Sequence, residues 1–521
     1  MFSSAEEPSA KLFCCGPLRR WVPLALREEL YHILCMTGPL LSYRVLNFLT
    51  PFVVTMFCGR LGNTVLAGYA MASVITSVTT LATGGGLILA CNTLISQTFG
   101  AKNLLRVGVI LQRSVIILLL FCLPCWALLL NTQAILLLLG QEPEVARIAQ
   151  IYVMACIPAV PAIFLHLLLV AYLQNQGPIP QMLKVAASPL PGWSRESLHE
   201  WGSFMKLAIP SAAMFCLEWW VYEFGGLFAG MLSEDDLASQ HVVMMIAFLN
   251  YMVPLSIQGA TCVRVGNALG AGDTAGAIRT GRVCLALAAV LAVFQGVILA
   301  STKSVIGFIF TSDEYVAIYN SMGILLGAGR QRIAAVANLF GYYCIGLPVG
   351  IALMFSAGLR VTGFWLGLLI SVCVQTTFFL TTISKMNWKI ITKEAVARAG
   401  VNVCKTLVPE PDPEQITLES NRVAENGHGS LVHQGQEGLR AQSSEGQQPA
   451  ALLSSSQLLL RRGFTALATL LILAVGVTVH LLLPLPESSW ASRTNVTIEA
   501  GNWTTATPLE QTTLPFLTSC I

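Results

Sequence analysis

Residues 115–130 read VIILLLFCLPCWALLL, a run in which no side chain carries a charge. The run lies in a longer apolar stretch at 107–130, and a helix needs about 20 such residues to cross the hydrocarbon core of a bilayer. The same pattern recurs along the chain and predicts ten membrane spans. They lie near 33–57, 65–93, 107–130, 150–173, 205–231, 237–260, 283–301, 333–356, 361–384 and 464–484. We therefore expect an all-α protein that crosses a membrane many times.

The composition supports this expectation. Only 11% of the 521 residues are charged, whereas 55% are apolar. Ordinary soluble domains carry about 25% charged residues, so the shortage excludes a cytosolic enzyme, a disordered chain and a nucleic-acid binder, which would need clustered Lys and Arg. The sequence also lacks the H-E-x-x-H and G-x-S-x-G motifs, and no carboxylate–His pair recurs at the spacing of metal ligands. We therefore predict no enzymatic activity and no metal site.

The charged residues of the loops predict the topology. Basic residues gather in alternate connections, which places the N-terminus in the cytoplasm. One step breaks the pattern, because only about 15 residues, Tyr315–Gly329, separate the external connection at 303–314 from the basic Arg330-Gln-Arg332. A helix of that length covers roughly 22 Å of a core about 30 Å thick. The segment is thus either a re-entrant or distorted crossing, or a place where a span is missing.

The C-terminal part gives a second indication of the number of spans. Asn495 and Asn502 each begin an N-x-Thr sequon, and these glycosylation candidates can be used only outside. Ten spans would leave them in the cytoplasm, whereas one more crossing would place them outside; two sequons in a Thr-rich tail can also arise by chance. Before the last span, residues 402–456 are rich in Glu, Gln, Ser and Pro, which is typical of a disordered linker.

An internal repeat divides the chain into two halves. Both halves have a Pro early in a span, a tight external turn, a second span and a Gly-Ala turn. At a constant offset, with a single slippage at the end, the matching pairs are Gly38-Pro39 with Ile209-Pro210, Phe57–Leu61 with Phe228–Leu232, and Gly100-Ala101 with Gly270-Ala271. The same order in the same orientation indicates a parallel repeat, as in transporters built from two lobes.

These landmarks belong to longer strings that carry a resemblance. The strings are FCGRLG (57–62), NTLISQTFG (92–100), VGVILQR (107–113), PCWALLLNTQ (124–133), YLQNQG (172–177), EWWVYE (218–223), YMVP (251–254), VRVGNALGAGD (263–273) and GYYCIGLP (341–348). Together they make the chain resemble the vertebrate multidrug and toxin extrusion (MATE) transporters of the proton-coupled organic-cation type, over nearly all of 25–390 and the last helix. The resemblance implies two pseudo-symmetric six-helix lobes, a thirteenth helix and an external C-terminus.

The chain is shorter than that plan. Past residue 177 it passes through 178–192 directly into the approach to the seventh family helix, so we expect family helices five and six to be absent. Most of the tenth is expected to be absent around Asn320–Arg332. The predicted organisation is a cytoplasmic N-terminus (1–31), an N-lobe of about four spans (32–192), a C-lobe of about five spans (193–400), a cytoplasmic linker (401–460), a C-terminal helix (461–485) and an extracellular tail (486–521).

Three charged side chains lie well inside predicted spans, at Arg44, Glu218 and Glu223. A charge at this depth is costly and indicates a functional site by default. Glu218 shares a helix face with Tyr222, whereas Glu223 lies about 140° away from Glu218. A carboxylate in apolar surroundings can exchange a proton near physiological pH and attracts an organic cation when deprotonated. We therefore predict Glu218 and Glu223 as proton- and cation-binding residues; the alternative is a carboxylate paired with a neighbour or facing a loop.

Aromatic residues nearby suit a cationic substrate. Trp219, Tyr222 and Tyr251 offer ring faces for cation–π contact, although Trp and Tyr also populate membrane interfaces. Tyr222 and Tyr251 occupy positions that the resemblance assigns to the family's site. Proline breaks backbone hydrogen bonds and bends a helix. Further candidates are the cavity-facing polar residues Arg44, Ser77 and Asn92 and the hinge residues Pro158, Pro161 and Pro210.

Several positions depart from the family pattern. Arg44 stands where the family has a neutral polar residue, Asn92 replaces a common Asp, and Met244-Met245 replace a Tyr-Glu pair. A further family glutamate, with a nearby His, belongs to the tenth helix. Half of the expected carboxylate set is therefore missing.

The residues and the resemblance together favour a secondary active antiporter in the plasma membrane. It would export organic cations (drugs, toxins and cationic metabolites) in exchange for protons by alternating access. Its partners would be small organic cations and the lipid bilayer, and no cofactor is implied besides the proton as coupling ion. The alternative is a non-transporting form, either a splice form or an incomplete gene model, with a structural or regulatory role only.

Overall fold

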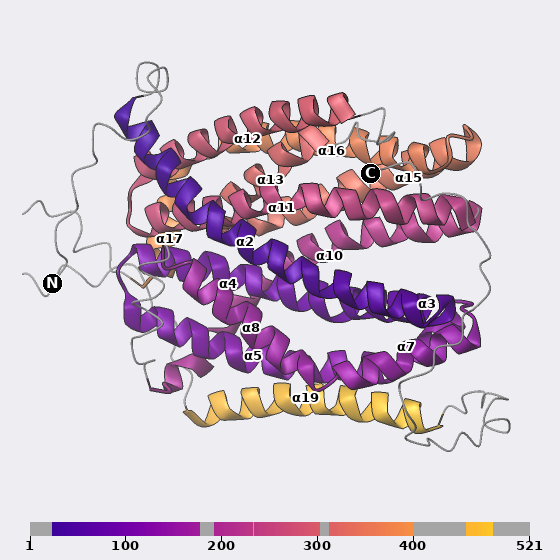
Figure 1. Cartoon of the computed structure of the whole chain (residues 1–521). Coiled ribbons are helices and arrows are strands. Elements are labelled where there is room, and N and C mark those ends of the chain that lie inside the picture. Colours follow the sequence, from indigo (N-terminus) through magenta and orange to yellow (C-terminus); the bar gives the residue numbers. More distant parts are fainter. Residues whose placement is uncertain (1–22, 178–191, 233, 303–311, 401–454, 483–521) are drawn as a thin grey trace, which may run out of the picture. The chain divides into compact units, whose positions relative to one another are not determined.

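The computed structural model describes residues 23–177, 192–232, 234–302, 312–400 and 455–482, and every regular element within these ranges is a helix (Figure 1). Eight of the helices are long and apolar enough to span a membrane, and a pair bent by 60° would make a ninth. Nine of the ten predicted spans fall within a single helix, within this bent pair or within helices that π-helical turns join, and the tenth, near 464–484, overlaps the helix Ser455–Leu482. The predicted all-α membrane fold is confirmed. The sequons at Asn495 and Asn502, the tail and most of the linker lie outside the described residues.

The N-terminal half begins with a long helix and continues with shorter ones. A π-helical turn at Ser77–Leu81 joins the second and third of them. The helices are α2 (Leu24–Leu61), α3 (Asn63–Thr76), α4 (Ala82–Gly100), α5 (Leu104–Leu130), α6 (Thr132–Leu138), α7 (Pro143–Cys156) and α8 (Ala159–Gln174).

The C-terminal half combines long helices with short ones. It contains α10 (Trp201–Leu232), α11 (Glu234–Gly270), α12 (Thr274–Thr302), α13 (Ser312–Gly327), α14 (Gln331–Asn338), α15 (Leu347–Ile351), α16 (Arg360–Lys385) and α17 (Trp388–Arg398). Two π-helical segments, Leu339–Gly346 and Ala352–Ser356, flank α15. The last helix, α19, covers Ser455–Leu482 and so begins before the expected start at 461.

The two larger of the three hydrophobic clusters among the described residues lie one in each half of the chain, and α10 takes part in both. Its first turns place Trp201 and Phe204 in the core of the N-terminal half, and its later turns place Met214 and Val221 in the core of the C-terminal half. The expected boundary between the lobes, at 192–193, thus lies before a helix that both halves share. The reason is that α10 runs along α4.

The segment that interrupted the charge pattern is helical. α13 has 16 residues, so it extends about 24 Å, less than the core of a bilayer. From Ile318 to Gly327 its side chains are all buried, and it packs against α11, α12 and α16. Because its neighbours are protein rather than lipid, it need not match the thickness of the membrane. Whether it stands in place of an absent family helix stays a prediction.

The two halves meet backbone to backbone at the end of the bundle that carries α17, on the left in Figure 1, which we call the α17 end. A Cβ added to Gly270 would lie 2.6 Å from the carbonyl carbon of Gln97, and one added to Gly100 would lie 2.7 Å from that of Asn267. Only glycine allows so close an approach. These are the Gly-Ala landmarks of the internal repeat, and they form the crossing of α4 and α11.

Polar contacts reinforce the same end. Glu29 of α2 accepts hydrogen bonds from Arg264 of α11, at 2.9 Å from Nε and 2.5 Å from Nη2, and from Thr280 of α12 at 2.7 Å. Arg398 of α17 donates to Gln97 of α4 at 2.8 Å. Both contacts join one half of the bundle to the other.

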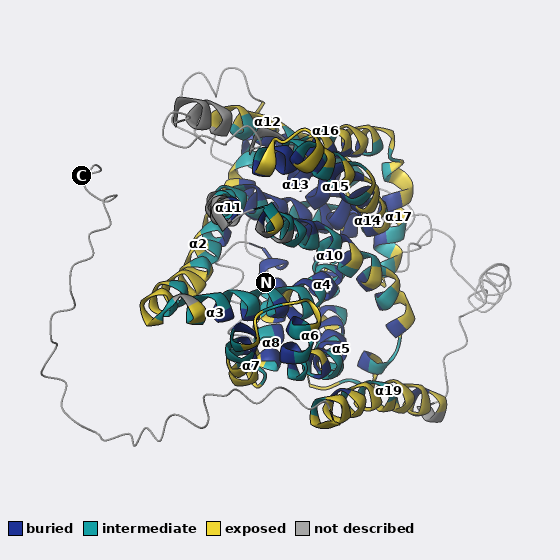
Figure 2. Ribbon diagram, turned by 90° about the vertical axis from the view of Figure 1, so that its right-hand side faces the viewer, coloured by how far each residue is buried: buried dark blue, intermediate teal, exposed yellow. Residues whose placement is uncertain are grey.

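The C-terminal helix α19 packs on α5 along the side of the N-terminal half. Figure 2 shows it as largely exposed, as expected of a helix that faces lipid. The Asn131 side chain donates to the Gly476 carbonyl at 2.9 Å, and Arg462 donates to the Leu198 carbonyl at 2.9 Å. The Arg462 guanidinium also lies 4.1 Å from the ring centroid of Trp201.

Candidate functional site

A pocket lies inside the C-terminal half between α10, α11, α13 and α16. On α10 the pocket is lined by Glu218, Trp219 and Tyr222. Tyr222 follows Glu218 by four positions and Trp219 by three, so the three side chains lie on one side of the helix. The α11 residues form a similar stripe. The remaining lining residues are Met244, Ala247, Phe248, Asn250, Tyr251 and Pro254 from α11, Tyr319 from α13 and Trp365 from α16.

The carboxylate of Glu218 is the charged group of this pocket. The residue is 3% exposed, and the Tyr319 hydroxyl interacts with its carboxylate. Its Oε1 atom and the Nε1 atom of Trp219 are buried, and neither has a hydrogen-bond partner within the described part of the chain. Buried polar atoms normally have one. These two atoms therefore mark the place where a proton or a polar ligand group would be held.

Aromatic rings form the wall beside this carboxylate. The Trp219 ring stacks on Phe248 with centroids 5.6 Å apart and meets the edge of Tyr251 at 6.0 Å. Tyr251 in turn meets Tyr319 edge to face at 4.7 Å. These separations are typical of favourable aromatic pairs, and the ring faces attract a cation. The site thus combines one carboxylate with several rings.

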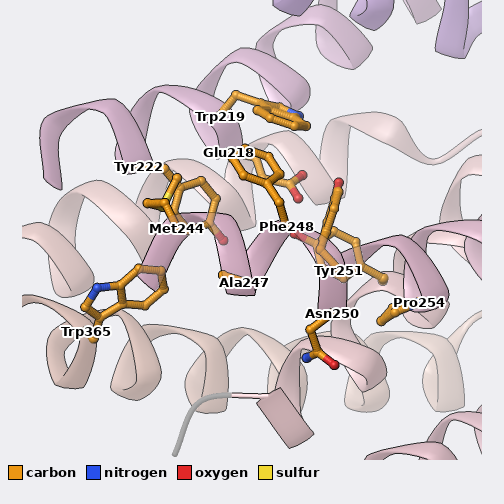
Figure 3. A pocket seen from close by; sticks show the side chains of 11 residues that line it. Glu218, Trp219, Tyr222, Met244, Ala247, Phe248, Asn250, Tyr251, Pro254 and Trp365 are labelled. Carbon is orange, nitrogen blue, oxygen red and sulfur yellow. The ribbon is translucent and has the colours of Figure 1, made fainter. Parts of the chain in front are cut away.

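The other end of the pocket is held by a hydrogen bond. Figure 3 shows Trp365 at this end and Glu218, Trp219 and Tyr251 at the opposite one. The indole of Trp365 donates to Gln240 at 2.8 Å. The cavity between the two ends has a volume of about 70 Å³. Drug-sized ligands need roughly 300–1,000 Å³, so in this arrangement the pocket has room for a small head group only.

Most of the predicted aromatic and acidic residues come together here. Glu218, Trp219, Tyr222 and Tyr251 all line the pocket, whereas Glu223 does not. The expected angle of about 140° between the two glutamates explains the difference. Met244, at the position of the missing family tyrosine, lines the pocket as well.

Seven of the eleven lining residues were not predicted, and three of these seven, Phe248, Tyr319 and Trp365, are aromatic. Phe248 could have been found, because it follows Met244 by four positions and precedes Tyr251 by three. Tyr319 and Trp365 lie on other helices, α13 and α16, and nothing local in the sequence connects them with α10.

The remaining candidates lie elsewhere. Asn92 accepts a hydrogen bond of 2.8 Å from Asn175 in the N-terminal half, and Ser77 opens the π-helical turn between α3 and α4. Neither lines the pocket. Arg44 lies on α2 and does not line the pocket either.

The predicted hinge prolines have different surroundings. Pro158 lies at the break between α7 and α8, where the chain bends by 60°. Pro161 belongs to the first turn of α8. Pro210 lies inside α10, which continues as a helix on both sides. A bend at Pro158 fits the loss of a backbone hydrogen bond at proline.

Comparison with known proteins decides the family. The MatE family model matches two stretches of the chain, residues 39–189 and 210–322. The chain belongs to the multidrug and toxin extrusion (MATE) family. The two stretches begin at Pro39 and Pro210, which are paired landmarks of the internal repeat. MATE proteins are transporters, so the family is one of transporters and not of enzymes.

The MATE relatives include vertebrate proteins that the chain matches over most of their length. The chain is 37% identical to Multidrug and toxin extrusion protein 1 of Danio rerio, over 91% of this chain and 94% of the relative. The corresponding human protein is 38% identical over 88% and 94%. The alignment with the Danio rerio protein runs over 558 positions, more than the 521 residues of this chain, so it contains positions without a counterpart here. The absence of family helices five, six and ten stays a prediction.

Solved MATE structures share the fold. The crystal structure of the eukaryotic MATE transporter AtDTX14 matches with a TM-score of 0.67 and 25% identity, over 72% of this chain and 100% of the other. That of a mutant of the Vibrio cholerae MATE transporter VcmN matches with a TM-score of 0.60 and 15% identity, over 71% and 100%. The predicted two-lobed MATE fold is confirmed.

Proposed function

We propose that this MATE protein exports organic cations in exchange for protons, and that the C-lobe pocket binds both. The observation that carries the proposal is the buried carboxylate of Glu218, with one oxygen unpartnered among the described residues, inside a pocket walled by aromatic rings. The relatives are named for the extrusion of drugs and toxins, which agrees with a pocket of this chemistry.

The proton and the cation compete for the same group. Deprotonated Glu218 attracts an ammonium head group, and the faces of Trp219 and Tyr251 add cation–π attraction. When Glu218 is protonated, the electrostatic part of this attraction is lost and the cation leaves. The small volume of the cavity restricts what it can hold to the head group of a substrate.

Alternating access would use the contacts at the α17 end. The protein would lie in the plasma membrane. We place the α17 end on the cytoplasmic side, because the basic connections between the helices gather at this end. While the α4–α11 crossing is closed, the pocket is shut off from the cytoplasm; separation of the halves at the crossing would open it to that side.

Flux into proteoliposomes tests the proposal. A pH gradient should drive uptake of a fluorescent organic cation, and Glu218→Gln should reduce this uptake at least tenfold, because the neutral amide cannot exchange a proton. Glu142→Gln is the control: it makes the same change at an exposed position just before α7, far from the pocket lining, and should retain most of the flux. Absence of pH-driven uptake by the wild type, or equal uptake by the Glu218→Gln variant, would overturn the mechanism.

A second candidate is a non-transporting form with a structural or regulatory role. The positions of the relatives that have no counterpart in this chain favour it. A folded protein that binds organic cations but moves none of them under any gradient would support this candidate over the first.

A further inference from the structure

The helix α13 belongs to the C-terminal half, but side chains of the N-terminal half hold its last turn. Backbone carbonyls at the end of a helix have no partner within that helix. Two of them, those of Leu326 and Gly327, accept hydrogen bonds from α4, at 2.7 Å from Thr93 and at 2.8 Å from Gln97. The one proton of the Thr93 hydroxyl is better placed for Leu326 than for the Leu89 carbonyl of its own helix, 3.5 Å away.

Both α4 side chains are in turn held by the C-terminal half. Gln331 of α14 donates to the Thr93 hydroxyl at 2.6 Å, and Arg398 of α17 donates to the amide oxygen of Gln97 at 2.8 Å. Thr93 and Gln97 are fully buried and lie four positions apart, on one face of α4. Two chains of hydrogen bonds therefore run through α4 to the end of α13.

The same helix reaches the pocket two turns earlier. Tyr319 lines the pocket, and its ring meets that of Tyr251 edge to face at 4.7 Å. From Tyr319 to Leu326 the distance along the helix axis is about 10 Å. A Cβ added to Gly323 or Gly327 would lie 2.7 Å from a carbonyl oxygen of α11. Glycine has no side chain to interlock with α11 at these two points, so the hydrogen bonds at the end of α13 help to set its register.

We propose that Thr93 is a positioning residue for the pocket: from the N-terminal half, it holds α13 in the register that places the Tyr319 ring in the aromatic wall. The inference rests on the proposed function, in which this wall and Glu218 bind the cationic head group. Thr93 does not line the pocket, so it acts on a bound cation only through α13. The arrangement of one half thus affects binding in the other.

Binding of a small cation tests this role. Calorimetry with benzyltrimethylammonium on the purified full-length protein in nanodiscs should show Thr93→Val, which keeps the shape of the side chain and removes its hydroxyl, binding about two- to tenfold more weakly, the effect of one hydrogen bond. Thr93→Ser keeps the hydroxyl and should bind like the wild type. Thr381→Val is the matched control, because that hydroxyl bonds within its own helix, α16, at 2.7 Å, and should leave the affinity unchanged. Wild-type affinity of Thr93→Val, or equal losses in the Ser and Val variants, would overturn the proposal.

Two measurements separate a positioning role from a general loss of stability. In a Tyr319→Leu background, which lacks the ring, Thr93→Val should weaken binding no further, although it should still lower the unfolding temperature; an undiminished second loss of affinity would overturn the proposal. Hydrogen exchange reports on α13 without a ligand. Thr93→Val should speed exchange about two- to tenfold from the last turn of α13 back to Tyr319. Faster exchange in the last turn alone would also overturn it.

Glu218→Gln in the same binding assay distinguishes this inference from the proposed function. If Glu218→Gln binds the probe like the wild type, the proposed site is contradicted and the role of Thr93 with it. If Glu218→Gln loses binding whereas Thr93→Val retains it, only the role of Thr93 is contradicted. Binding needs no proton gradient, so failure of pH-driven flux contradicts the antiport alone.

Discussion

Replacing Gly270 with Ala tests whether the two halves of the bundle meet backbone to backbone. The added Cβ would lie 2.6 Å from the carbonyl carbon and 2.8 Å from the Cα of Gln97, inside van der Waals contact. No side-chain rotation relieves this overlap, because the clash is with main-chain atoms, so α4 and α11 must move apart. Gly100→Ala should act in the same way, since its Cβ would lie 2.7 Å from the same two atoms of Asn267.

The size of the effect follows from two opposing terms. Overpacking of a close contact costs about 1–3 kcal/mol, and a main-chain clash belongs at the upper end, about 3 kcal/mol. Ala has a helix propensity about 1 kcal/mol more favourable than Gly, which offsets part of this cost. We expect a net loss of about 2 kcal/mol for either variant. Because both clashes belong to one crossing, a single separation relieves both, and the double variant should lose no more than either single one.

Thermal unfolding of the purified protein measures these differences. Either single variant should unfold a few degrees below the wild type. Gly226→Ala is the control, because this glycine also lies inside a helix but an added Cβ would have no atom within 4 Å; it should unfold at or above the wild-type temperature. If Gly100→Ala and Gly270→Ala behave like this control, or if the double variant loses the sum of both, the reasoning is refuted.

Three further substitutions test other contacts. Arg264→Gln removes the bidentate partner of Glu29 and should lower the free energy of unfolding by about 1–3 kcal/mol at low salt and by less at high salt. An equal loss of unfolding free energy at low and at high salt would argue against an ion pair. Trp365→Phe leaves Gln240 without its donor and should cost about 1–3 kcal/mol in thermal unfolding, and an unchanged transition would show that this bond contributes nothing. Arg462→Ala removes the cation–π contact of α19 and should speed hydrogen exchange in that helix alone, by about tenfold or less; faster exchange throughout the bundle would contradict a local role.

Local patterns predicted the helices but not their ends. The helix expected near 33–57 runs in the structure from Leu24 to Leu61. Its added N-terminal turns contain Glu29, which accepts a hydrogen bond from Arg264, and a pairing between such distant parts of the chain leaves no local signal. The shortness of the segment around Tyr315–Gly329 was visible in the sequence. Its burial was not, since burial depends on the helices that surround it.

The candidate site divides in the same way. Helical spacing placed Glu218 and Tyr222 on one face and separated Glu223 from them, and the pocket agrees with both statements. Tyr319 and Trp365 complete the site from α13 and α16. They could not be predicted, because a residue that contributes through tertiary packing looks in the sequence like any other aromatic residue of an apolar helix.

The crossing of α4 and α11 has a symmetry of its own. In the register of the Gly-Ala landmarks, Gly100 corresponds to Gly270 and Gln97 corresponds to Asn267. Gln97 contacts Gly270, and Asn267 contacts Gly100. Replacing each residue by its counterpart in the other repeat therefore turns the first contact into the second. A contact of this reciprocal kind is isologous, like the interface of a two-fold homodimer. The surface is thus complementary to itself. Two separate copies of a single repeat would close through the same residues, and a gene duplication that joined them would need no new interface.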